Sequence, residues 1–379
     1  MRILLLNQGF LPHSGQLANA LVEGGDEVLY ITCGCGWDFT GVPDPKSDFR
    51  EFLDPRVSLE WIPIPSNTTP LTLAANIRFI AQMVKTIQRF DPDVIHVHDM
   101  ADYRYLATVA RVRSRYPIVM SVHNAEPHVG KKDNRMEFLR PWLRRMPDLV
   151  IVHGEHIKRR LLSVTNIFAE DRLYVIPVGS YMYHRKWLTG QADDGKTVLF
   201  FGGITRYKGL EYLIRATPLV SKHVPDARFL IAGSGADWPR CKAMIQNPES
   251  FILREGRLTN PEVTEIFEQS SVVVLPYIEA SQSGVMAVAY ALGKPVIVTN
   301  VGSLPEVVAE GETGLIVPPA DVDALAKAII RILADTELCR AMGDKAYERA
   351  SVGDLTWTNV AAKTREVYVA AIKIRKGKR

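Results

Sequence analysis

The chain has 379 residues, which suits two domains of ordinary size better than one. Hydrophobic residues make up 47% and charged residues 23%, the balance of a soluble globular protein with a sizeable core. The formal net charge of +4 is too small for a dedicated nucleic-acid-binding protein, so no nucleic-acid partner is expected.

The four cysteines indicate neither a zinc site nor a disulfide framework. Only Cys33 and Cys35 are close together, and no second pair of cysteines or histidines completes a metal site. The apolar run Ile3–Leu6 is too short for a secretory signal, and no apolar run of about 18 residues is present to span a membrane. We therefore expect a cytoplasmic protein, at most peripheral on the inner face of the plasma membrane.

Short apolar runs alternate with longer amphipathic stretches in the first half of the chain. The apolar runs predict buried strands and the stretches between them predict helices, as in a parallel sheet covered on both faces. The predicted strands are Ile3–Leu6, Val28–Thr32, Leu59–Ile62, Val94–Val97, Ile118–Val122 and Leu149–Val152, and the predicted helices include Leu17–Glu23, Thr72–Arg89 and Tyr103–Arg115.

The same alternation restarts in the second half, after the polar segment Ser180–Lys196, which we interpret as an interdomain linker. The predicted strands there are Val198–Phe201, Phe229–Ala232, Ile252–Arg254, Val272–Leu275, Val296–Thr299 and Leu315–Val317, with helices at Leu210–Lys222 and Met286–Leu292.

The sequence therefore predicts an α/β protein with two Rossmann-like domains that face each other across a deep cleft. We place the domains at residues 1–183 and 184–356. Residues 357–379 predict a long helix and a basic tail, which either continue the second domain or cross back to the first. Parallel sheets bind ligands at the carboxyl ends of their strands, so candidate site residues are expected there.

One strand-end loop combines glycines with cations. Gly202 and Gly203 directly follow a predicted strand, and Arg206 and Lys208 stand just before the next helix. Amides at a helix N-terminus attract anions, and Arg and Lys beside them suit a diphosphate. The alternative is a solvated turn with two surface cations, and the placement at the end of a strand favours the diphosphate.

A second polar turn follows another strand of the second half. Ser281, Gln282, Ser283 and Gly284 lead into a helix, where hydroxyls and backbone amides can bind a phosphate. Glu279 stands just before them and can accept hydrogen bonds from sugar hydroxyls. The alternative interpretation is a helix cap beside a solvated glutamate.

Two further glycines at strand ends are weaker candidates. Gly233 belongs to a Gly-Ser-Gly turn, and Gly15 lies in the expected loop after the first strand. A glycine at such a point lets the backbone approach a ligand closely.

Histidines cluster at the predicted strand ends of the first half. His96 and His98 flank Val97, His123 follows one strand and His153 follows the next. Such side chains suit either polar contacts to a sugar or a metal site. No carboxylate-rich motif accompanies them, so we expect no metal.

Two segments are basic. Residues 131–145 combine six cations with Phe138 and Trp142, and residues 373–379 add five more cations. A basic segment with aromatic residues can bind an anionic membrane surface. A solvated helix that packs its apolar side internally is the equally supported alternative.

Together these motifs resemble the retaining glycosyltransferases of the GT-B fold, family 4, and the resemblance covers nearly the whole chain. Its most specific parts are Gly202–Gly209, Glu279–Ile297, Val301–Glu306 and Gly311–Pro318, and Asp93–His98 and Val122–Asn124 match less specific features.

The resemblance implies a hexosyltransferase that moves a sugar from a nucleoside diphosphate, UDP or GDP, to a hydroxyl of a glycan or lipid-linked acceptor. It implies retention of the anomeric configuration and no metal or other cofactor. The basic segments favour a lipid-linked or membrane-proximal glycan acceptor, and hence a role in cell-surface polysaccharide or glycolipid synthesis. Residues 1–183 then bind the acceptor and 184–356 the nucleotide sugar, with domain closure excluding water.

Carried over residue by residue, the resemblance makes Arg206 and Lys208 the cations that stabilise the departing diphosphate. His123 is similar to the family's histidine near the donor sugar. Glu279 is similar to the first carboxylate of a Glu, seven residues, Glu motif, and Glu306 is a further donor contact. The remaining donor-binding candidates are Gly15, Gly202, Gly203, Gly233, Ser281, Gln282, Ser283 and Gly284.

The chain departs from the family pattern at two points. Gly203 stands where the family has an arginine, and Arg206 follows three residues later. The second motif glutamate is missing, because the position eight residues after Glu279 is Ala287, and counting back from Gly293 gives Val288, which would put Ala280 in register with the first glutamate. This loss affects the expected contact to the nucleotide ribose.

Two other functions remain open. A nucleotide-sugar epimerase can share this two-domain architecture, and a non-catalytic nucleotide-binding scaffold is compatible with the missing glutamate. An NAD-dependent dehydrogenase is disfavoured, since Asn7–Gln16 lacks the G-x-G-x-x-G turn.

Overall fold

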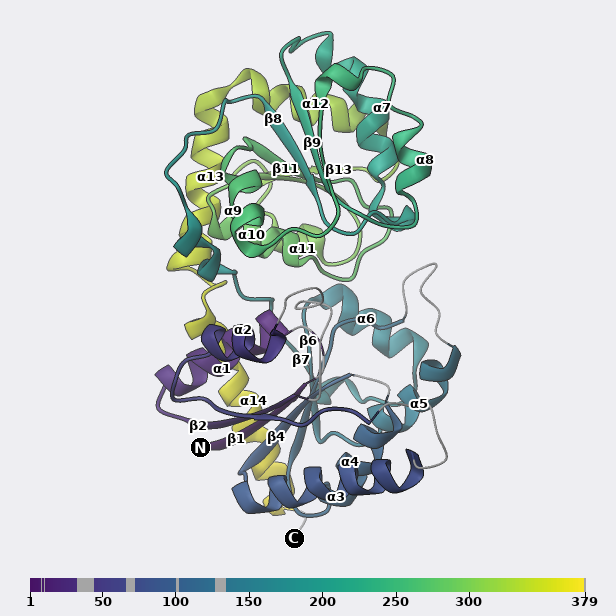
Figure 1. Ribbon diagram of the computed structural model, residues 1–379, viewed down its shortest axis with the longest axis vertical. Coiled ribbons are helices and arrows are strands. Elements are labelled where there is room, and N and C mark those ends of the chain that lie inside the picture. The colour runs from purple at the N-terminus through teal and green to yellow at the C-terminus, as the bar shows by residue number, and fades with distance from the viewer. Residues whose placement is uncertain are drawn as a thin grey trace. The chain divides into compact units, whose positions relative to one another are not determined.

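The computed structural model describes residues 1–7, 9, 11–32, 44–65, 72–99, 102–126 and 134–377. Two compact units emerge, one formed by Met1–Pro177 with Trp357–Arg379 and the other by Val178–Thr356. Each unit is a Rossmann-like fold with helices packed on a parallel sheet (Figure 1). The predicted fold class of two parallel α/β domains is confirmed.

The first unit is built on a seven-stranded sheet in the order β3-β2-β1-β4-β5-β6-β7. All its strand pairs are parallel, and in register Leu4 lies between Leu29 and Ile95. The strands are β1 (Arg2–Asn7), β2 (Glu27–Thr32), β3 (Ser58–Trp61), β4 (Val94–His98), β5 (Ile118–Val122), β6 (Leu149–Val152) and β7 (Leu173–Val175).

Helices cover both faces of this sheet, because successive residues of a strand point to opposite sides. Leu4 and Leu6 join a buried cluster with Phe79 and Met83 of α3, while Ile3 and Leu5 are fully buried on the other face. The helices are α1 (Leu11–Glu23), α2 (Pro45–Phe52), α3 (Thr72–Phe90), α4 (Tyr103–Val112), α5 (Asn134–Arg144), α6 (Glu155–Val164) and α14 (Trp357–Gly377), with the short η2 (Glu170–Arg172).

The C-terminal helix belongs to the first unit. Helix α14, yellow in Figure 1, packs beside α1 and against β4 and β5. Val360 and Val367 are buried there, and Arg365 forms an ion pair with the buried Asp26 of the α1–β2 turn. The last part of the chain therefore completes the core begun by its first strands.

The second unit is built on a six-stranded parallel sheet in the order β10-β9-β8-β11-β12-β13. Its strands are β8 (Thr197–Phe201), β9 (Arg228–Gly233), β10 (Phe251–Glu255), β11 (Val272–Leu275), β12 (Val296–Thr299) and β13 (Gly314–Val317). In β8, Phe200 packs into the cluster formed with α7 and α12, and Leu199 into the cluster on the opposite face with α9, α10 and α13.

The helices of the second unit alternate with its strands. They are η3 (Met182–Trp187), η4 (Arg206–Lys208), α7 (Leu210–Ser221), α8 (Trp238–Lys242), η5 (Pro248–Ser250), α9 (Asn260–Glu268), α10 (Gly284–Ala291), α11 (Leu304–Val307), α12 (Val322–Ala334) and α13 (Thr336–Ser351).

The interpretation of residues 180–196 as an interdomain linker is wrong, because this segment packs within the second unit. The Ser180 amide donates to the Leu355 carbonyl and the Tyr181 amide to that of Ala287. Further along, the buried Glu268 carboxylate accepts hydrogen bonds from the amides of Thr189 and Gly190. The polar composition of the segment reflects these specific hydrogen bonds.

Two smaller predictions also differ from the structure. Helix α1 begins at Leu11, so the residues before Leu17, which we expected to form a loop, form the first part of the helix. Pro12 is tolerated there because the amides of a first helical turn have no helical partner. Strand β7 was not predicted, since only Leu173 of its three residues is buried.

Candidate functional site

The strand order reverses once in each sheet, between β1 and β4 in the first unit and between β8 and β11 in the second. At such a point the loops after two neighbouring strands lead away in opposite directions and leave room for a ligand at the carboxyl edge. Lys208 follows β8 and Glu279 follows β11, beside the second point, whereas His123 follows β5, the strand next to β4.

In the second unit, Lys208 is held at the switch point by Tyr277. The Lys208 ammonium donates a 2.7 Å hydrogen bond to the Tyr277 hydroxyl and lies 4.4 Å from the centre of that ring. The Ser283 Oγ lies 3.4 Å from the same hydroxyl. Lys208 follows β8, whereas Tyr277 and Ser283 follow β11, so the fold joins the two predicted phosphate-binding loops.

Gly202 lies against this group. Lys208 Nζ is 3.8 Å from the position that a Cβ would occupy on Gly202, so the cation lies directly over the glycine backbone. The position of Gly203 is different, because it is exposed and a Cβ there would meet nothing within 4 Å.

Gly233 has a packing role that explains its presence. A Cβ on this residue would lie 2.0 Å from the Gly202 carbonyl oxygen, and its φ of 142° is strained for residues other than glycine. Gly209, with φ 63°, approaches the Pro276 carbonyl in the same way. These glycines let the loops after β8, β9 and β11 pack backbone against backbone.

Helix α10 begins without a side-chain cap. Its N-cap, Ser283, makes no side-chain capping hydrogen bond, and the helix starts at Gly284. Ser281 and Gln282 are half-buried just before it, and the Gln282 Oε1 is buried without a hydrogen-bond partner among the described residues. Ala287 and Val288, the two positions that can correspond to the missing glutamate, are both buried within the helix and provide no carboxylate.

The other predicted charged residues lie on the same edge with different exposure. Arg206 is exposed in η4 and belongs to no ion pair within the described part of the chain. Glu279 is half-buried in the bend after β11, and Glu306 is exposed on α11, which follows β12. Tyr277 was missed by the sequence analysis, although its place directly after Pro276 at a strand end was a usable signal.

In the first unit, imidazoles gather at the carboxyl ends of β4, β5 and β6. His98 Nδ1 and His123 Nε2 are hydrogen bonded at 2.9 Å, and the ring of His153 lies 4.7 Å from that of His123. His13 of α1 packs edge-on against all three rings and against Trp357. Its participation was not predicted, because α1 was expected to begin later.

His96 belongs to the same cluster and connects it to the C-terminal helix. Its Nδ1 is 2.7 Å from the Tyr368 hydroxyl of α14, and its Nε2 is 2.9 Å from the Ser121 hydroxyl of β5. The ring stacks on His98 with 5.3 Å between ring centres. We refer to His13, His96, His98, His123 and His153 as the histidine cluster.

Burial keeps the histidine cluster uncharged at neutral pH. Desolvation lowers the pKa of His96 to about 3 and that of His153 to about 4, and it lowers the pKa of His13, His98 and His123 well below the usual range. The rings therefore act as neutral hydrogen-bonding groups, each with one N–H donor and one nitrogen acceptor.

The described residues contain no group of three or more His, Cys, Asp or Glu side chains that could hold a metal ion. Gly15 also differs from its predicted surroundings, because it lies inside α1 and not in a loop. A Cβ on Gly15 would lie 2.6 Å from the Phe52 ring, so this glycine serves the packing of α1 against α2.

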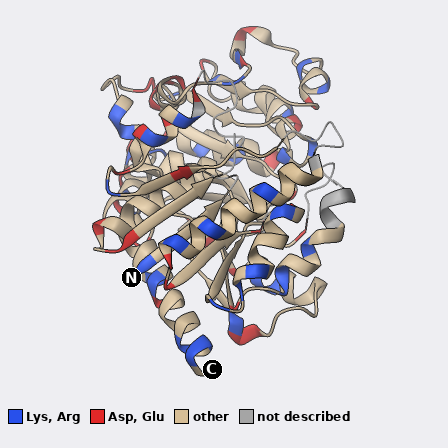
Figure 2. Ribbon diagram, turned by 60° about the horizontal axis from the view of Figure 1, so that its bottom comes forward, with Lys and Arg blue, Asp and Glu red and all other residues tan. Residues whose placement is uncertain are grey.

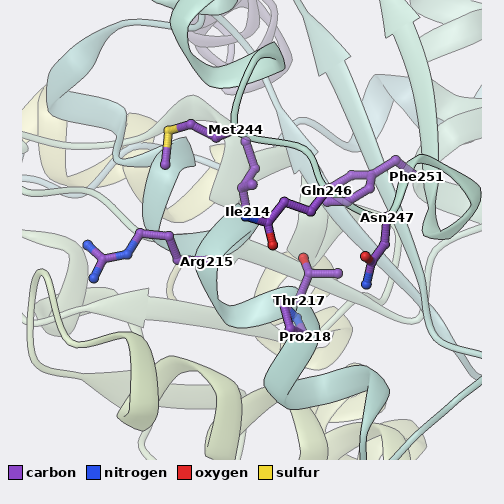
Figure 3. Close-up of a pocket in the computed structure, with 8 residues that line it drawn as sticks. All are labelled: Ile214, Arg215, Thr217, Pro218, Met244, Gln246, Asn247 and Phe251. Carbon is purple, nitrogen blue, oxygen red and sulfur yellow. The ribbon is translucent and has the colours of Figure 1, made fainter.

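A separate pocket of about 420 Å³ lies beside α7 (Figure 3). Phe251 is the first residue of β10, so the pocket lies at the amino end of that strand, away from the candidate site. It is lined by Ile214, Arg215, Thr217, Pro218, Met244, Gln246, Asn247 and Phe251.

Part of the basic segment 131–145 is used internally. Arg140 and the buried Arg144 both pair with the buried Asp99, so neither contributes a free surface charge. Phe138 and Trp142 are 73% and 57% exposed on the same helix. Lys131 and Lys132 lie outside the described residues, as do Lys378 and Arg379, and Arg375 of the C-terminal segment pairs with Asp148.

Solved structures share this two-unit fold. Sucrose-phosphate synthase from Thermosynechococcus elongatus aligns with a TM-score of 0.73 at 22% identity, covering 99% of this chain and 100% of the other. Anabaena HepE in complex with UDP aligns with a TM-score of 0.72 at 16% identity, covering 98% and 100%. The fold is thus that of the GT-B proteins.

A further structural neighbour is described as a UDP-N-acetylglucosamine 2-epimerase from Listeria monocytogenes, with a TM-score of 0.63 at 15% identity, covering 100% of this chain and 97% of that one. The fold alone therefore does not separate a transferase from an epimerase.

The sequence comparisons make that distinction. The Glycosyltransferase Family 4 model matches residues 13–179, and the Glycosyl transferases group 1 model matches residues 195–335. An uncharacterized glycosyltransferase of Methanocaldococcus jannaschii is 28% identical over 74% of this chain and 76% of its own length. The phosphatidyl-myo-inositol mannosyltransferase of Mycolicibacterium smegmatis is 26% identical over 95% and 89%. The chain belongs to the family 4 glycosyltransferases.

Proposed function

We propose that this glycosyltransferase moves a hexose-type sugar from a UDP- or GDP-linked donor to a hydroxyl of a glycan or lipid-linked acceptor. The observation that carries the proposal is the grouping of Lys208, Tyr277 and Ser283 at the switch point of the second sheet. A cation over a glycine backbone, beside the uncapped start of α10, is suited to a diphosphate. The UDP bound to HepE is in keeping with such a donor.

The reaction proposed is transfer with retention of the anomeric configuration and without a metal. Negative charge develops on the leaving diphosphate as the glycosidic bond breaks, and the Lys208 ammonium stabilises it. Arg206, exposed and outside any described ion pair, supplies a second cation. The proton of the acceptor hydroxyl passes to a phosphate oxygen of the donor, so no strong protein base is required.

His123 and Glu279 are assigned to the sugar. His123 is neutral, because burial lowers its pKa, and it therefore offers hydrogen bonds and no charge to the hydroxyl groups. Glu279, at the bend after β11, accepts hydrogen bonds from the transferred sugar. Gly202, Gly203, Gln282 and Glu306 belong to the same donor-binding edge in this proposal.

We place the acceptor in cell-surface polysaccharide or glycolipid synthesis, close to a membrane. The exposed aromatic side chains of Phe138 and Trp142 support this placement close to a membrane. Figure 2 shows Lys and Arg interspersed with Asp and Glu along the ribbon. Among the described residues, no helix combines the length and apolar character needed to cross a membrane.

Binding to anionic vesicles tests whether charge attracts the protein to a membrane surface. Binding that persists unchanged in high salt, or that is absent in low salt, contradicts this electrostatic attraction.

The deciding experiment is a thermal-shift screen against UDP, GDP, ADP and their sugar conjugates, with Lys208→Ala and the exposed Lys222→Ala as a matched control. One nucleoside diphosphate should raise the Tm of the wild type and of Lys222→Ala by mass action, and shift Lys208→Ala far less. Turnover of that donor should fall about 10²- to 10³-fold in Lys208→Ala.

The outcomes separate the alternatives. Epimerised donor formed without any acceptor favours the epimerase, and tight nucleotide binding without turnover favours the scaffold. If no nucleotide shifts the Tm, the proposed donor site is wrong.

A further inference from the structure

The tautomer of His153 is fixed by its surroundings. Its Nδ1 lies 3.0 Å from the backbone carbonyl oxygen of Ile176, just after β7. A carbonyl oxygen only accepts hydrogen bonds, so Nδ1 carries the proton. Burial lowers the pKa of this imidazole to about 4, so the ring holds a single proton at neutral pH. Its Nε2 is therefore an acceptor with a free lone pair.

That lone pair is unused. The Nε2 of His153 is buried and has no hydrogen-bond partner among the residues that the structure describes. A buried acceptor without a donor is destabilising, so a protein keeps one where something else supplies the hydrogen. The ring follows β6 at the carboxyl edge of the sheet, the edge at which ligands of such folds bind.

The neighbours of His153 indicate what the donor is. The rings of His13 and His123 lie 4.9 and 4.7 Å from it, and both are neutral imidazoles. Among the described residues, no group of three or more side chains that could hold a metal ion is present. A neutral acceptor among neutral rings suits an O–H donor, and hydroxyls are what a carbohydrate offers.

We propose that His153 Nε2 accepts a hydrogen bond from a carbohydrate hydroxyl of the substrate, beside His123. The proposal rests on the transferase function proposed above, and it adds a substrate contact that determines which hydroxyl pattern is accepted. The hydroxyl belongs either to the transferred sugar or to the acceptor, and the experiment distinguishes the two.

A pair of variants isolates the lone pair. His153→Asn keeps a donor near the Nδ1 position for the Ile176 carbonyl and removes the Nε2 acceptor. His153→Gln instead places an amide oxygen near the Nε2 position. We expect kcat/KM to fall roughly 10- to 100-fold in His153→Asn and less than about 5-fold in His153→Gln, the range for a lost hydroxyl contact. Binding of UDP or GDP alone should be unchanged.

Deoxy-sugar substrates then identify the contact. Removing the contacted hydroxyl from the substrate should lower the kcat/KM of the wild type by the same factor as the His153→Asn substitution does. It should cause no further fall in the kcat/KM of His153→Asn. If the contacted hydroxyl belongs to the transferred sugar, His153→Asn also slows donor hydrolysis measured without acceptor. If it belongs to the acceptor, His153→Asn raises only the acceptor KM.

The inference is overturned if the Asn and Gln variants lose activity equally while every deoxy penalty is the same as in wild type, or if neither variant changes kcat/KM. If His153→Asn does not fold, His153→Gln gives the decision. A kcat/KM within about 5-fold of wild type, with the deoxy penalties kept, supports the contact, and a larger loss with every deoxy penalty kept overturns it. A wild type that turns over no nucleotide sugar refutes the proposed function instead.

Discussion

The two units share an architecture and differ in what they present at the carboxyl edge of the sheet. The first unit carries five buried, neutral imidazoles on and after β4, β5 and β6 and on α1, whereas at the β8/β11 switch point a lysine lies over a glycine beside two hydroxyls. The same topology thus carries two kinds of polar group. In the function proposed above, the first edge binds uncharged hydroxyls and the second binds a diphosphate.

The largest effect is expected from a substitution that disrupts the carboxyl edge of the sheet in the second unit. Gly233→Ala places a Cβ 2.0 Å from the Gly202 carbonyl oxygen at a φ of 142°. We expect a loss of at least about 2 kcal/mol in the free energy of unfolding and loss of nucleotide binding, because the loops after β8 and β9 must separate. Urea unfolding and nucleotide titration measure both effects.

Gly203→Ala is the matched control, since its Cβ would meet nothing within 4 Å. It should change the unfolding free energy by no more than about 0.5 kcal/mol. Equal destabilisation by the two substitutions would show that the interlocked loops do not maintain this edge.

The next-largest effect distinguishes the two units by how their stability depends on pH. Folded imidazoles of the histidine cluster have a lowered pKa, for example about 4 for His153, while unfolded histidines titrate near pH 6.5. Below pH 6.5 the unfolded chain therefore binds more protons, and the stability of the first unit falls as the pH drops from 6.5 towards 4. Each ring contributes up to about 1.4 kcal/mol per pH unit.

Hydrogen exchange at pH 7.5 and 5.5, corrected for intrinsic rates, measures this unit by unit. Protection should fall more in β4–β6 than in β8–β11, because the described part of the second unit has one such ring, His184, with its pKa lowered to about 4. His153→Asn should reduce the slope by one proton. Equal losses in both units would contradict the assignment.

The smallest effect concerns the support of Lys208. Tyr277→Phe keeps the ring beneath the ammonium and removes the hydroxyl that accepts its hydrogen bond. We expect kcat/KM to fall about tenfold, the value of one hydrogen bond to a charged group.

Tyr290→Phe serves as the control, because it removes a buried hydroxyl bonded to Thr313 in the same unit. Its Tm is expected to fall while kcat/KM stays at the wild-type value. A Tyr277→Phe enzyme with wild-type kcat/KM would mean that Lys208 does not depend on this hydroxyl.

Local sequence patterns were sufficient for most of the fold. The apolar runs at Ile3–Leu6 and Val272–Leu275 are strands because both faces of each sheet are covered, which makes every residue of the run buried. Helix α1 was started too late because Pro12, Ser14 and Gly15 are turn formers, while their place in the first turn and against Phe52 depends on tertiary packing.

The candidate site was less accessible to sequence reasoning. The glycines and cations after β8 were visible, but the bond from Lys208 to Tyr277 joins residues 69 positions apart. The pairing of Arg144 with Asp99 spans 45 positions and removes a charge from a segment that looked like a basic surface. Such contacts follow from strand order, which the local pattern does not determine.

Helix α14 has a consequence for how this protein is made. A ribosome delivers residues 1–177 first, yet Tyr368, which bonds to His96 inside the first unit, emerges only after the whole second unit. The second unit, by contrast, is contiguous from Val178 to Thr356. During synthesis the unit made later is therefore the one able to finish folding first, while the earlier one waits for its last helix.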